Sequence, residues 1–247
     1  MSRFENRSFV ITGGSGGIGL ATAKRIVAEG GRVLITGTNQ SKLDSASDGQ
    51  SIIGLINDAG DHSSTQQLTE AAKSHFGQID GVFLNAGFGI FAPHTDVTAE
   101  QYDQQYAVNV RGPILQAGAL SPLVKDGGNL LLNTSVAQDL GMEGGVIYNS
   151  TKGALRTVVR VLAKELSPRK IRVNAVSPGP IGSDFFERTG IPQEQMEQMA
   201  AGIQAMVPLD RFGTVDEVAA VALFLMSDEA SFVTGAEYVV DGGMTQV

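Results

Sequence analysis

Short apolar segments alternate with amphipathic ones along the whole chain. The segments between the apolar runs carry apolar residues at helical spacing. The alternation predicts an α/β fold: a doubly wound parallel sheet of about seven strands, with right-handed crossover helices on both faces. Strands covered on both faces are apolar at nearly every position, and seven segments fit this description: "SFVIT", "RVLITG", "SIIGLI", "DGVFLNAG", "NLLLNTS", "IRVNAVSPG" and "EYVVDGG".

Two of the predicted helices begin with the spacing of a capping box. In this motif a Ser or Thr side chain and a Gln side chain three residues later each bind the other's backbone N–H. The pairs are Ser64 with Gln67 and Thr98 with Gln101. A longer helical stretch, "YNSTKGALRTVVRVLAKELS", separates the fifth and sixth predicted strands.

Composition narrows the class of protein. No linker, repeat or low-complexity run divides the 247 residues, so we expect a single domain over residues 1–247. The longest apolar runs are too short to cross a bilayer, and 26 acidic against 18 basic residues leave no basic stripe for nucleic acid. The N-terminus lacks an apolar leader and the chain has no cysteine, so a cytoplasmic protein without membrane or nucleic-acid partners is expected.

The stretch "ITGGSGGIGL" allows three interpretations. It could be a nucleophile elbow with Ser15 at its tip, a glycine turn that cradles phosphates, or a glycine turn without a ligand. An elbow needs a histidine later in the chain to activate the serine. The histidines are His62, His75 and His94, and more than half of the chain follows the last of them. The elbow is therefore disfavoured, while a lone glycine motif leaves the other two interpretations open.

In the phosphate-binding interpretation each glycine has a physical role. Gly13 permits the tight turn, Gly17 lets backbone approach a pyrophosphate, and Gly19 lets the helix pack closely on the strand. The amides and the dipole of the helix N-terminus favour an anion. Ser15 can add a hydroxyl donor.

Tyr148 and Lys152 are four residues apart in the long helical stretch, so they share one face. A phenol titrates at about pKa 10, and a neighbouring ammonium favours its phenolate. The alternative is an exposed tyrosine beside a solvated lysine, which is the commoner meaning of a random pair at this spacing. Ser135 ends the fifth predicted strand, where it could face the same crevice or merely cap a turn.

Asn85 and Asn109 are polar residues in apolar surroundings. A buried asparagine most often satisfies backbone groups, so each has a structural alternative. The loop "SPGPIGSDFF" directly follows the sixth predicted strand, at the expected mouth of the crevice.

Taken together, these motifs resemble those of the short-chain dehydrogenase/reductase family, which includes ketoreductases and 3-oxoacyl carrier protein reductases. The order and spacing of the motifs match the family over almost the whole chain. The resemblance implies a single-domain Rossmann-like fold and hydride transfer between a nicotinamide cofactor and a carbonyl or secondary alcohol. The motifs are Thr12 to Gly19, Asn85 to Gly87, Asn109, Ser135, "YNSTK", "SPGPI" and the closing "VTGAEYVVDGG".

The resemblance also implies catalytic roles. Tyr148 would be the general acid, and Ser135 would bind the substrate oxygen and stabilise its developing charge. Lys152 would lower the pKa of Tyr148 and bind the nicotinamide ribose. Asn109 would hold a water in a proton relay from Lys152 to solvent.

Further residues are implied to bind the cofactor. Asn85, Ala86 and Gly87 would flank the adenosine ribose, Asp58 would meet the adenine amino group, and Ile181 and Ser183 would contact the nicotinamide carboxamide, although the family usually has threonine at the position of Ser183. The expected cofactor site comprises Thr12, Gly13, Ser15, Gly17, Ile18, Gly19, Thr38, Asn39, Lys42, Asp58, Asn85, Ala86, Gly87, Tyr148, Lys152, Pro178, Gly179, Ile181 and Ser183.

The second predicted strand ends without the carboxylate that NAD enzymes place about twenty residues after the glycine turn. Gly37, Thr38 and Asn39 would not repel a 2'-phosphate and Lys42 is close, so NADP is expected, with NAD not excluded. Relatives that use NADP often carry arginine where Thr38 stands. A nucleotide-binding sensor or scaffold without turnover is the alternative function.

Substrate and assembly follow from two further segments. Residues 184–210 are expected to form a helical substrate lid, whose apolar residues indicate an apolar or adaptable pocket: Phe185, Phe186, Met196, Met199 and Met206. The helix "ALRTVVRVLAKEL" is apolar on more than one face, and in the resembled family this helix and the C-terminal strand form subunit interfaces, so a homotetramer is expected.

Overall fold

Seven strands form one parallel sheet, as the apolar runs predict. The computed structural model describes residues 2–183 and 193–247, without the side chains of residues 193–198. The strands lie in the order β3-β2-β1-β4-β5-β6-β9. Their bounds are β1 Ser8–Ile11, β2 Arg32–Gly37, β3 Ile52–Ile56, β4 Ile79–Leu84, β5 Val124–Asn133, β6 Arg172–Pro178 and β9 Glu237–Val240.

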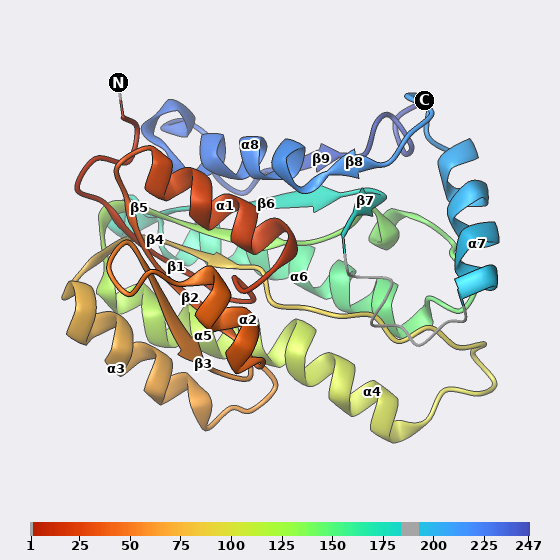
Figure 1. Ribbon diagram of the computed structural model, residues 1–247, viewed down its shortest axis with the longest axis horizontal. Coiled ribbons are helices and arrows are strands. Elements are labelled where there is room, and N and C mark those ends of the chain that lie inside the picture. Colours follow the sequence, from red (N-terminus) through yellow and green to blue (C-terminus); the bar gives the residue numbers. More distant parts are fainter. Residues whose placement is uncertain (1, 184–192) are drawn as a thin grey trace.

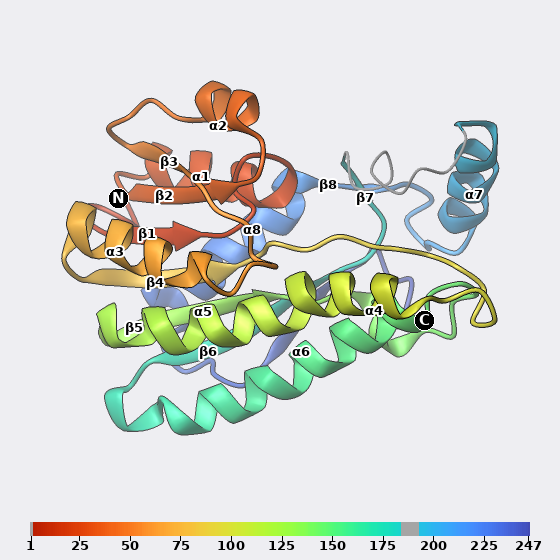
Figure 2. The same ribbon diagram turned by 90° about the horizontal axis from the view of Figure 1, so that it is seen from below.

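Helices connect the strands and cover both faces of the sheet (Figure 1). In the view of Figure 2, α4, α5 and α6 lie on the opposite side of the sheet from α1 and α8. The helices are α1 Gly17–Ala28, α2 Gln40–Ala46, α3 Ser64–Phe76, α4 Ala99–Tyr106, α5 Gly112–Leu120, α6 Val146–Glu165, α7 Gln193–Ala205 and α8 Val215–Met226.

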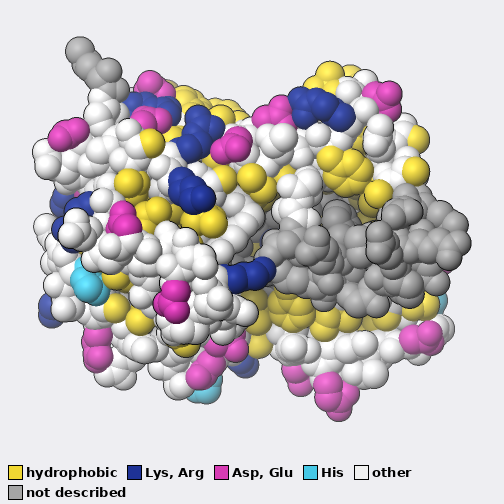
Figure 3. All heavy atoms as spheres, in the orientation of Figure 1, with side chains coloured by type: hydrophobic (Ala, Val, Ile, Leu, Met, Phe, Trp, Pro, Cys, Tyr) yellow, Lys and Arg dark blue, Asp and Glu magenta, His cyan; other side chains and the backbone are white. Residues whose placement is uncertain are grey.

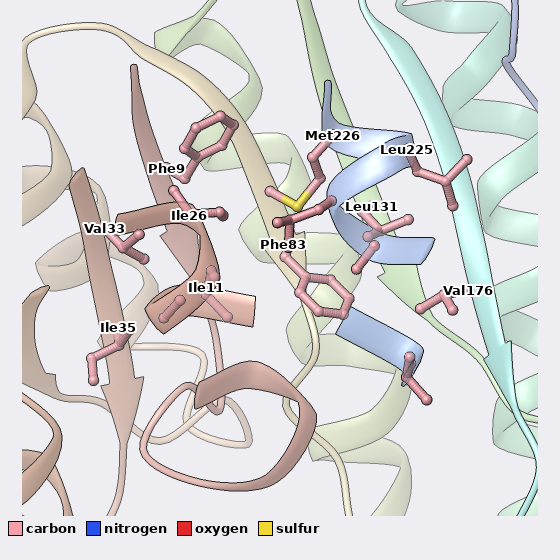
Figure 4. Close-up of a cluster of buried hydrophobic side chains, with 14 of the residues drawn as sticks. Phe9, Ile11, Ile26, Val33, Ile35, Phe83, Leu131, Val176, Leu225 and Met226 are labelled. Carbon is pink, nitrogen blue, oxygen red and sulfur yellow. The ribbon is translucent and has the colours of Figure 1, made fainter. Parts of the chain in front are cut away.

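Alternate residues of each strand point to opposite faces and form two cores. Phe9 and Ile11 of β1 pack with α1 and α8, in the cluster that Figure 4 shows. Val10 of β1 packs with α3, α5 and α6 on the other face. All three β1 side chains are fully buried. A central strand covered on both sides explains why β1 is apolar from Phe9 to Ile11.

The two expected capping boxes have different outcomes. The Thr98–Gln101 box at the start of α4 is confirmed, since both reciprocal hydrogen bonds form. The Ser64–Gln67 box is wrong, because α3 begins one residue earlier than expected and Ser63 precedes its first residue. The Ser64 hydroxyl instead donates to the backbone oxygens of Asp58 and Asp61, each at 2.7 Å. A competing loop contact has therefore replaced the cap.

The strand order reverses between β1 and β4, which places a crevice at the carboxyl ends of the central strands. A small second sheet lies near this end: β7 Ile181–Gly182 pairs in parallel with β8 Gly213–Thr214. These two-residue strands are too short for the hydrophobic pattern to predict. Among the described residues, no helix combines the length and apolar character needed to span a membrane.

Candidate active site

The glycine turn joins β1 to α1 and leaves the start of the helix open. Gly13 and Gly17 have φ angles of 64° and 52°, which favour glycine. Gly16 precedes α1, and no side chain caps the helix amides. A Cβ added at Gly17 would meet no protein atom within 4 Å. The first amides of α1 therefore face open space, as binding of an anionic group requires.

Hydrogen bonds from two neighbouring strands fix the shape of this turn. The Thr12 hydroxyl accepts from the backbone N–H groups of Asn85 and Ala86, both at 3.1 Å. The Asn85 side chain donates to the backbone oxygens of Thr12 and Gly13, also at 3.1 Å. Asn133 at the end of β5 donates to the Asn85 side-chain oxygen at 2.9 Å. Asn85 thus ties β1, β4 and β5 together beneath the turn.

Gly19 allows close packing, although its partner differs from the expected strand. A Cβ at Gly19 would lie 2.6 Å from the Asn85 Nδ2 atom and 2.6 Å from the Gly13 carbonyl oxygen. A Cβ at Gly13 would lie 2.9 Å from the Cα atom of Ala86. The helix therefore packs on the turn and on Asn85, and larger residues at Gly13 or Gly19 would force these groups apart.

Tyr148 and Lys152 lie one turn apart on α6, and both are buried. Their exposed fractions are 8% and 4%, which excludes the alternative of an exposed tyrosine beside a solvated lysine. The Lys152 ammonium lies 5.6 Å from the centre of the Tyr148 ring. It donates to the backbone oxygen of Asn133 at 2.9 Å. The pair is thereby held against the carboxyl end of β5.

Burial shifts both pKa values away from their usual range. Burial raises the pKa of Tyr148 to about 12, opposed in part by the hydrogen bond between Tyr148 and Ser135. Burial lowers the pKa of Lys152 to about 8. The net pKa of Tyr148 is raised because desolvation of the phenolate outweighs the hydrogen bond with Ser135, while the expected lowering by Lys152 stays a prediction. At neutral pH the phenol is protonated, the form that a proton donor needs.

Ser135 brings its hydroxyl to Tyr148 from the end of β5, where η3 (Val136–Asp139) begins. The Ser135 Oγ atom accepts from the Ala137 N–H at 3.2 Å and donates to the Pro178 carbonyl oxygen at 3.4 Å. Two hydroxyls from different elements thus converge on one point, where both could bind a single substrate oxygen.

Asn109 lies in the π-helical turn η1 (Ala107–Arg111), close to Lys152, and is fully buried. Its side chain donates to the Phe88 oxygen at 2.8 Å and to the Thr151 hydroxyl at 3.2 Å, and accepts from the Phe88 N–H at 3.1 Å. A Cβ on Gly87 would lie 3.3 Å from the Asn109 Oδ1 atom and 3.6 Å from the Lys152 Nζ atom. Asn109 therefore holds the segment after β4 against α6.

A cavity of about 510 Å³ opens in front of Ser135 and Tyr148. Phe91 and Glu143 line it without having been predicted, and the Phe91 ring centre lies 5.4 Å from that of Tyr148. Asn133 and Thr134 also line it, and their position next to Ser135 in "LLLNTS" is a signal that could have revealed them. The predicted residues that line it are Ile18, Asn85, Gly87, Ser135, Tyr148, Lys152, Pro178, Gly179, Ile181 and Ser183.

A second, polar pocket of about 390 Å³ lies between α1 and α2. Two of its lining residues, Ser15 and Lys42, belong to the predicted cofactor site, whereas Lys24, Ser41 and Ser45 were not predicted. The lysine pair gives this pocket a positive charge.

The remaining predicted residues lie outside the lining of both pockets. The Asn39 side chain caps α2 by accepting from the Lys42 N–H at 2.9 Å. Asp58 is exposed after β3, and its carboxylate accepts from the Gly60 N–H at 2.8 Å. The others are Thr38, which precedes α2, the turn residues Thr12, Gly13, Gly17 and Gly19, and Ala86 and Asn109.

Comparisons with known proteins agree with this arrangement. The family model described as enoyl-(acyl carrier protein) reductase matches residues 13–245. An uncharacterized oxidoreductase of Methylorubrum extorquens is 37% identical, over 99% of this chain and 100% of the relative.

Two solved structures have the same fold over nearly the whole chain. A short-chain dehydrogenase/reductase of Brucella melitensis, titled glucose/ribitol dehydrogenase, superposes with a TM-score of 0.92 at 30% identity, covering 99% of each chain. A blue fluorescent protein from a metagenomic library, solved in complex with NADPH, gives a TM-score of 0.87 at 29% identity, covering 98% of each chain.

The chain belongs to the short-chain dehydrogenase/reductase family. It is an NAD(P)-dependent oxidoreductase that transfers hydride between a nicotinamide cofactor and the carbonyl or secondary alcohol group of a small molecule.

Proposed function

We propose that the enzyme reduces a ketone with Tyr148 as proton donor and Ser135 as the group that binds the carbonyl oxygen. The observation that carries this proposal is the hydrogen-bonded pair of Ser135 and Tyr148 at the wall of the cavity, with the phenol protonated at neutral pH. As negative charge develops on the substrate oxygen, the Ser135 hydroxyl stabilises it and the Tyr148 phenol transfers its proton to it.

Lys152 and Asn109 support this step. The Lys152 ammonium lies close enough to the Tyr148 ring to stabilise the phenolate that forms when the proton leaves. Lys152 would also bind the nicotinamide ribose hydroxyls, and Asn109 would hold a water that returns a proton from solvent. Burial of both residues supports roles at a site shielded from bulk water.

The glycine turn fits a dinucleotide, because its open space and uncapped helix amides suit a pyrophosphate. When bound, the reduced nicotinamide supplies the hydride. Residues Thr12 to Gly19 would hold the phosphates, Asn85, Ala86 and Gly87 would flank the adenosine ribose, and Asp58 would meet the adenine. Pro178, Gly179, Ile181 and Ser183 would contact the nicotinamide end, and their position around the cavity supports this.

We also propose a preference for NADPH over NADH. A 2'-phosphate would fit the polar pocket beside Ser15, where Lys24 and Lys42 supply positive charge and the nearby Thr38 and Asn39 bring no carboxylate. Replacing both lysines by alanine should lower kcat/KM for NADPH at least tenfold and leave that for NADH within threefold. A wild-type kcat/KM for NADH equal to or above that for NADPH would contradict the preference.

The substrate should be apolar, with residues 184–210 as its lid. Met199, Ile203 and Met206 of this segment line the cavity, together with Met142 and Met244 from other loops. Methionines adapt their shape to a ligand.

Three residues of the expected lid lie outside the part of the chain whose side chains the structure describes: Phe185, Phe186 and Met196. Figure 3 shows hydrophobic side chains at the surface of the end of the molecule that carries α7.

The single domain is proposed to assemble as a homotetramer in the cytoplasm. Apolar side chains on α5 and α6 remain exposed in one copy, which supports contact with further copies.

The proposed reaction is tested by following NADPH absorbance with a panel of aryl alkyl ketones and diketones. Wild-type enzyme should consume NADPH with at least one ketone, and Ser135→Ala should lower kcat at least tenfold while NADPH still binds. Binding of NADPH without turnover of any ketone would contradict the proposed ketone reduction.

A further inference from the structure

A partly buried carboxylate, that of Glu237 on the edge strand β9, reaches the segment that carries Ser135. The Glu237 Oε1 atom accepts from the Thr134 hydroxyl at 2.6 Å. The Glu237 Oε2 atom accepts from the Gln138 amide at 2.7 Å and pairs with the Arg156 Nε atom at 3.2 Å. The carboxylate thus binds one residue before Ser135 and one residue three positions after it, and contacts α6 as well.

The side chain of Glu237 crosses a neighbouring strand to make these contacts. Glu237 on β9 lies opposite Ala175 on β6, and β6 lies between β9 and β5. Thr134 at the end of β5 also binds β6, since its N–H donates to the Val176 oxygen at 2.9 Å, and its hydroxyl, which donates to Glu237 at the shorter distance, lies 3.0 Å from the same oxygen. The residue before Ser135 is therefore anchored to two strands at once.

Besides its hydrogen bond to Tyr148, the Ser135 hydroxyl makes two long contacts to backbone groups. Its bonds to Ala137 and Pro178 measure 3.2 Å and 3.4 Å, so they hold the hydroxyl weakly. Shorter contacts are made by its neighbours Thr134 and Gln138 to Glu237. The orientation of Ser135 then depends on how firmly these two flanking residues are held.

Glu237 on β9 and Arg156 on α6 form an ion pair that is largely shielded from solvent. The side chains of Glu237 and Arg156 are 12% and 18% exposed. Burying an ionised pair loses hydration, and apolar residues of similar size commonly serve a fold as well or better. Here the carboxylate accepts from three donors of the site's own scaffold, an arrangement that fixes geometry.

We propose that Glu237 is a positioning residue for the reaction, which sets the orientation of the Ser135 hydroxyl through Thr134 and Gln138, with Arg156 as its counter-charge. The inference rests on the proposed role of Ser135. Glu237 itself is separated from the reacting atoms by Thr134, so it acts on the rate of the chemical step rather than on cofactor binding.

The central test compares Glu237→Ala with Glu237→Gln. The alanine variant should lower kcat for the ketone about tenfold or more, because small misplacements of a catalytic group are costly. Its KM for the ketone and Kd for NADPH should stay within threefold. Glutamine should restore kcat to within threefold of wild type, since its amide can donate to Thr134 while the Thr134 hydroxyl donates to Val176.

Thr134→Val provides a second variant that breaks the same contact without unpairing Arg156. It should also lower kcat, and the double variant with Glu237→Ala should be no slower than the slower single variant, because both changes remove one interaction. Fully additive losses would contradict a shared path through Thr134.

Asp80→Ala is the matched structural control. Asp80 is a similarly buried carboxylate, 17% exposed, that pairs with Lys125 at the amino end of β4, away from the site. It should lose stability without loss of kcat. If Asp80→Ala and Glu237→Ala lowered kcat equally and in proportion to their stability, the positioning role would be overturned in favour of a general structural one.

Hydrogen–deuterium exchange gives a readout independent of turnover. The amides of residues 133–140 should exchange faster in Glu237→Ala and at the wild-type rate in Glu237→Gln. Wild-type kcat and exchange in Glu237→Ala, with kcat still lowered by Ser135→Ala, would overturn the role of Glu237 alone. An unaffected Ser135→Ala variant would overturn the proposed function as well.

Discussion

The Lys152 ammonium makes the stability of the cofactor-free fold depend on pH. Burial lowers the pKa of Lys152 from 10.5 to about 8. Between these values the unfolded chain binds more protons than the folded one, so the free energy of unfolding rises with pH through this window. The shift corresponds to a gain on the order of 3 kcal/mol from this one residue.

Denaturant titrations at about pH 7 and pH 10 would measure this gain. Wild-type protein should show it, and Lys152→Met should lack it, because methionine carries no titrating group. The series ends near pH 10, since the raised pKa of Tyr148 has the opposite effect at higher pH. Equal pH dependence in the two proteins would contradict the lowered Lys152 pKa.

At the residue scale, sequence spacing placed Tyr148, Lys152 and Ser135 on one crevice, and the structure brings them together. The direction of the Tyr148 pKa shift could not be obtained in this way, because it depends on burial by segments distant in sequence. Phe91 and Met244 reach the cavity through loops with no regular pattern, so their place also requires the tertiary structure.

At the scale of elements, the junction of the glycine turn with α1 is packed too closely for a side chain at Gly19. Gly19→Ala should weaken NADPH binding at least tenfold, because its Cβ would displace Asn85 or the Gly13 carbonyl. Fluorescence titration with NADPH measures this effect.

Gly118→Ala on α5 is the control for that experiment. A Cβ there meets no atom within 4 Å, and alanine favours a helix over glycine by roughly 0.5–1 kcal/mol. It should therefore leave NADPH affinity unchanged. Equal NADPH affinity in the Gly19→Ala variant and wild type would contradict the close-packing account.

The inner strands of the main sheet were predictable because continuous apolar runs are required where both faces are covered. The capping box of α4 was also predictable, since local hydrogen bonds alone form it. The box of α3 was not, because the Ser64 hydroxyl binds the loop after β3 instead. The π-helical turn that carries Asn109 was not predicted either, and its contacts to Phe88 and Thr151 join residues distant in sequence.

At the scale of the whole molecule, exposed apolar side chains on α5 and α6 predict association. Ile114 and Leu115 on α5 are 44% and 42% exposed, and Val161 on α6 is 49% exposed. Light scattering at micromolar concentration should give the mass of a tetramer, which corresponds to four chains of 25.9 kDa. A monomer would contradict the proposal.

Val161→Glu should split this tetramer into smaller species, because a charge at a covered apolar contact opposes association. Gln67→Glu, an exposed change on α3, is the control and should leave the mass unchanged. The same mass for wild type and Val161→Glu would show that this part of α6 lies outside the interface.

The central claim, proton transfer by Tyr148, is tested most directly by Tyr148→Phe. The substitution removes one hydroxyl and keeps the ring that packs against Phe91. With NADPH and a ketone that wild type reduces, kcat should fall by at least the ~10²-fold typical of losing a general acid, while the Kd for NADPH changes little. Lys152→Ala should instead lower kcat and weaken NADPH binding together. A kcat within about threefold of wild type for Tyr148→Phe would contradict the account.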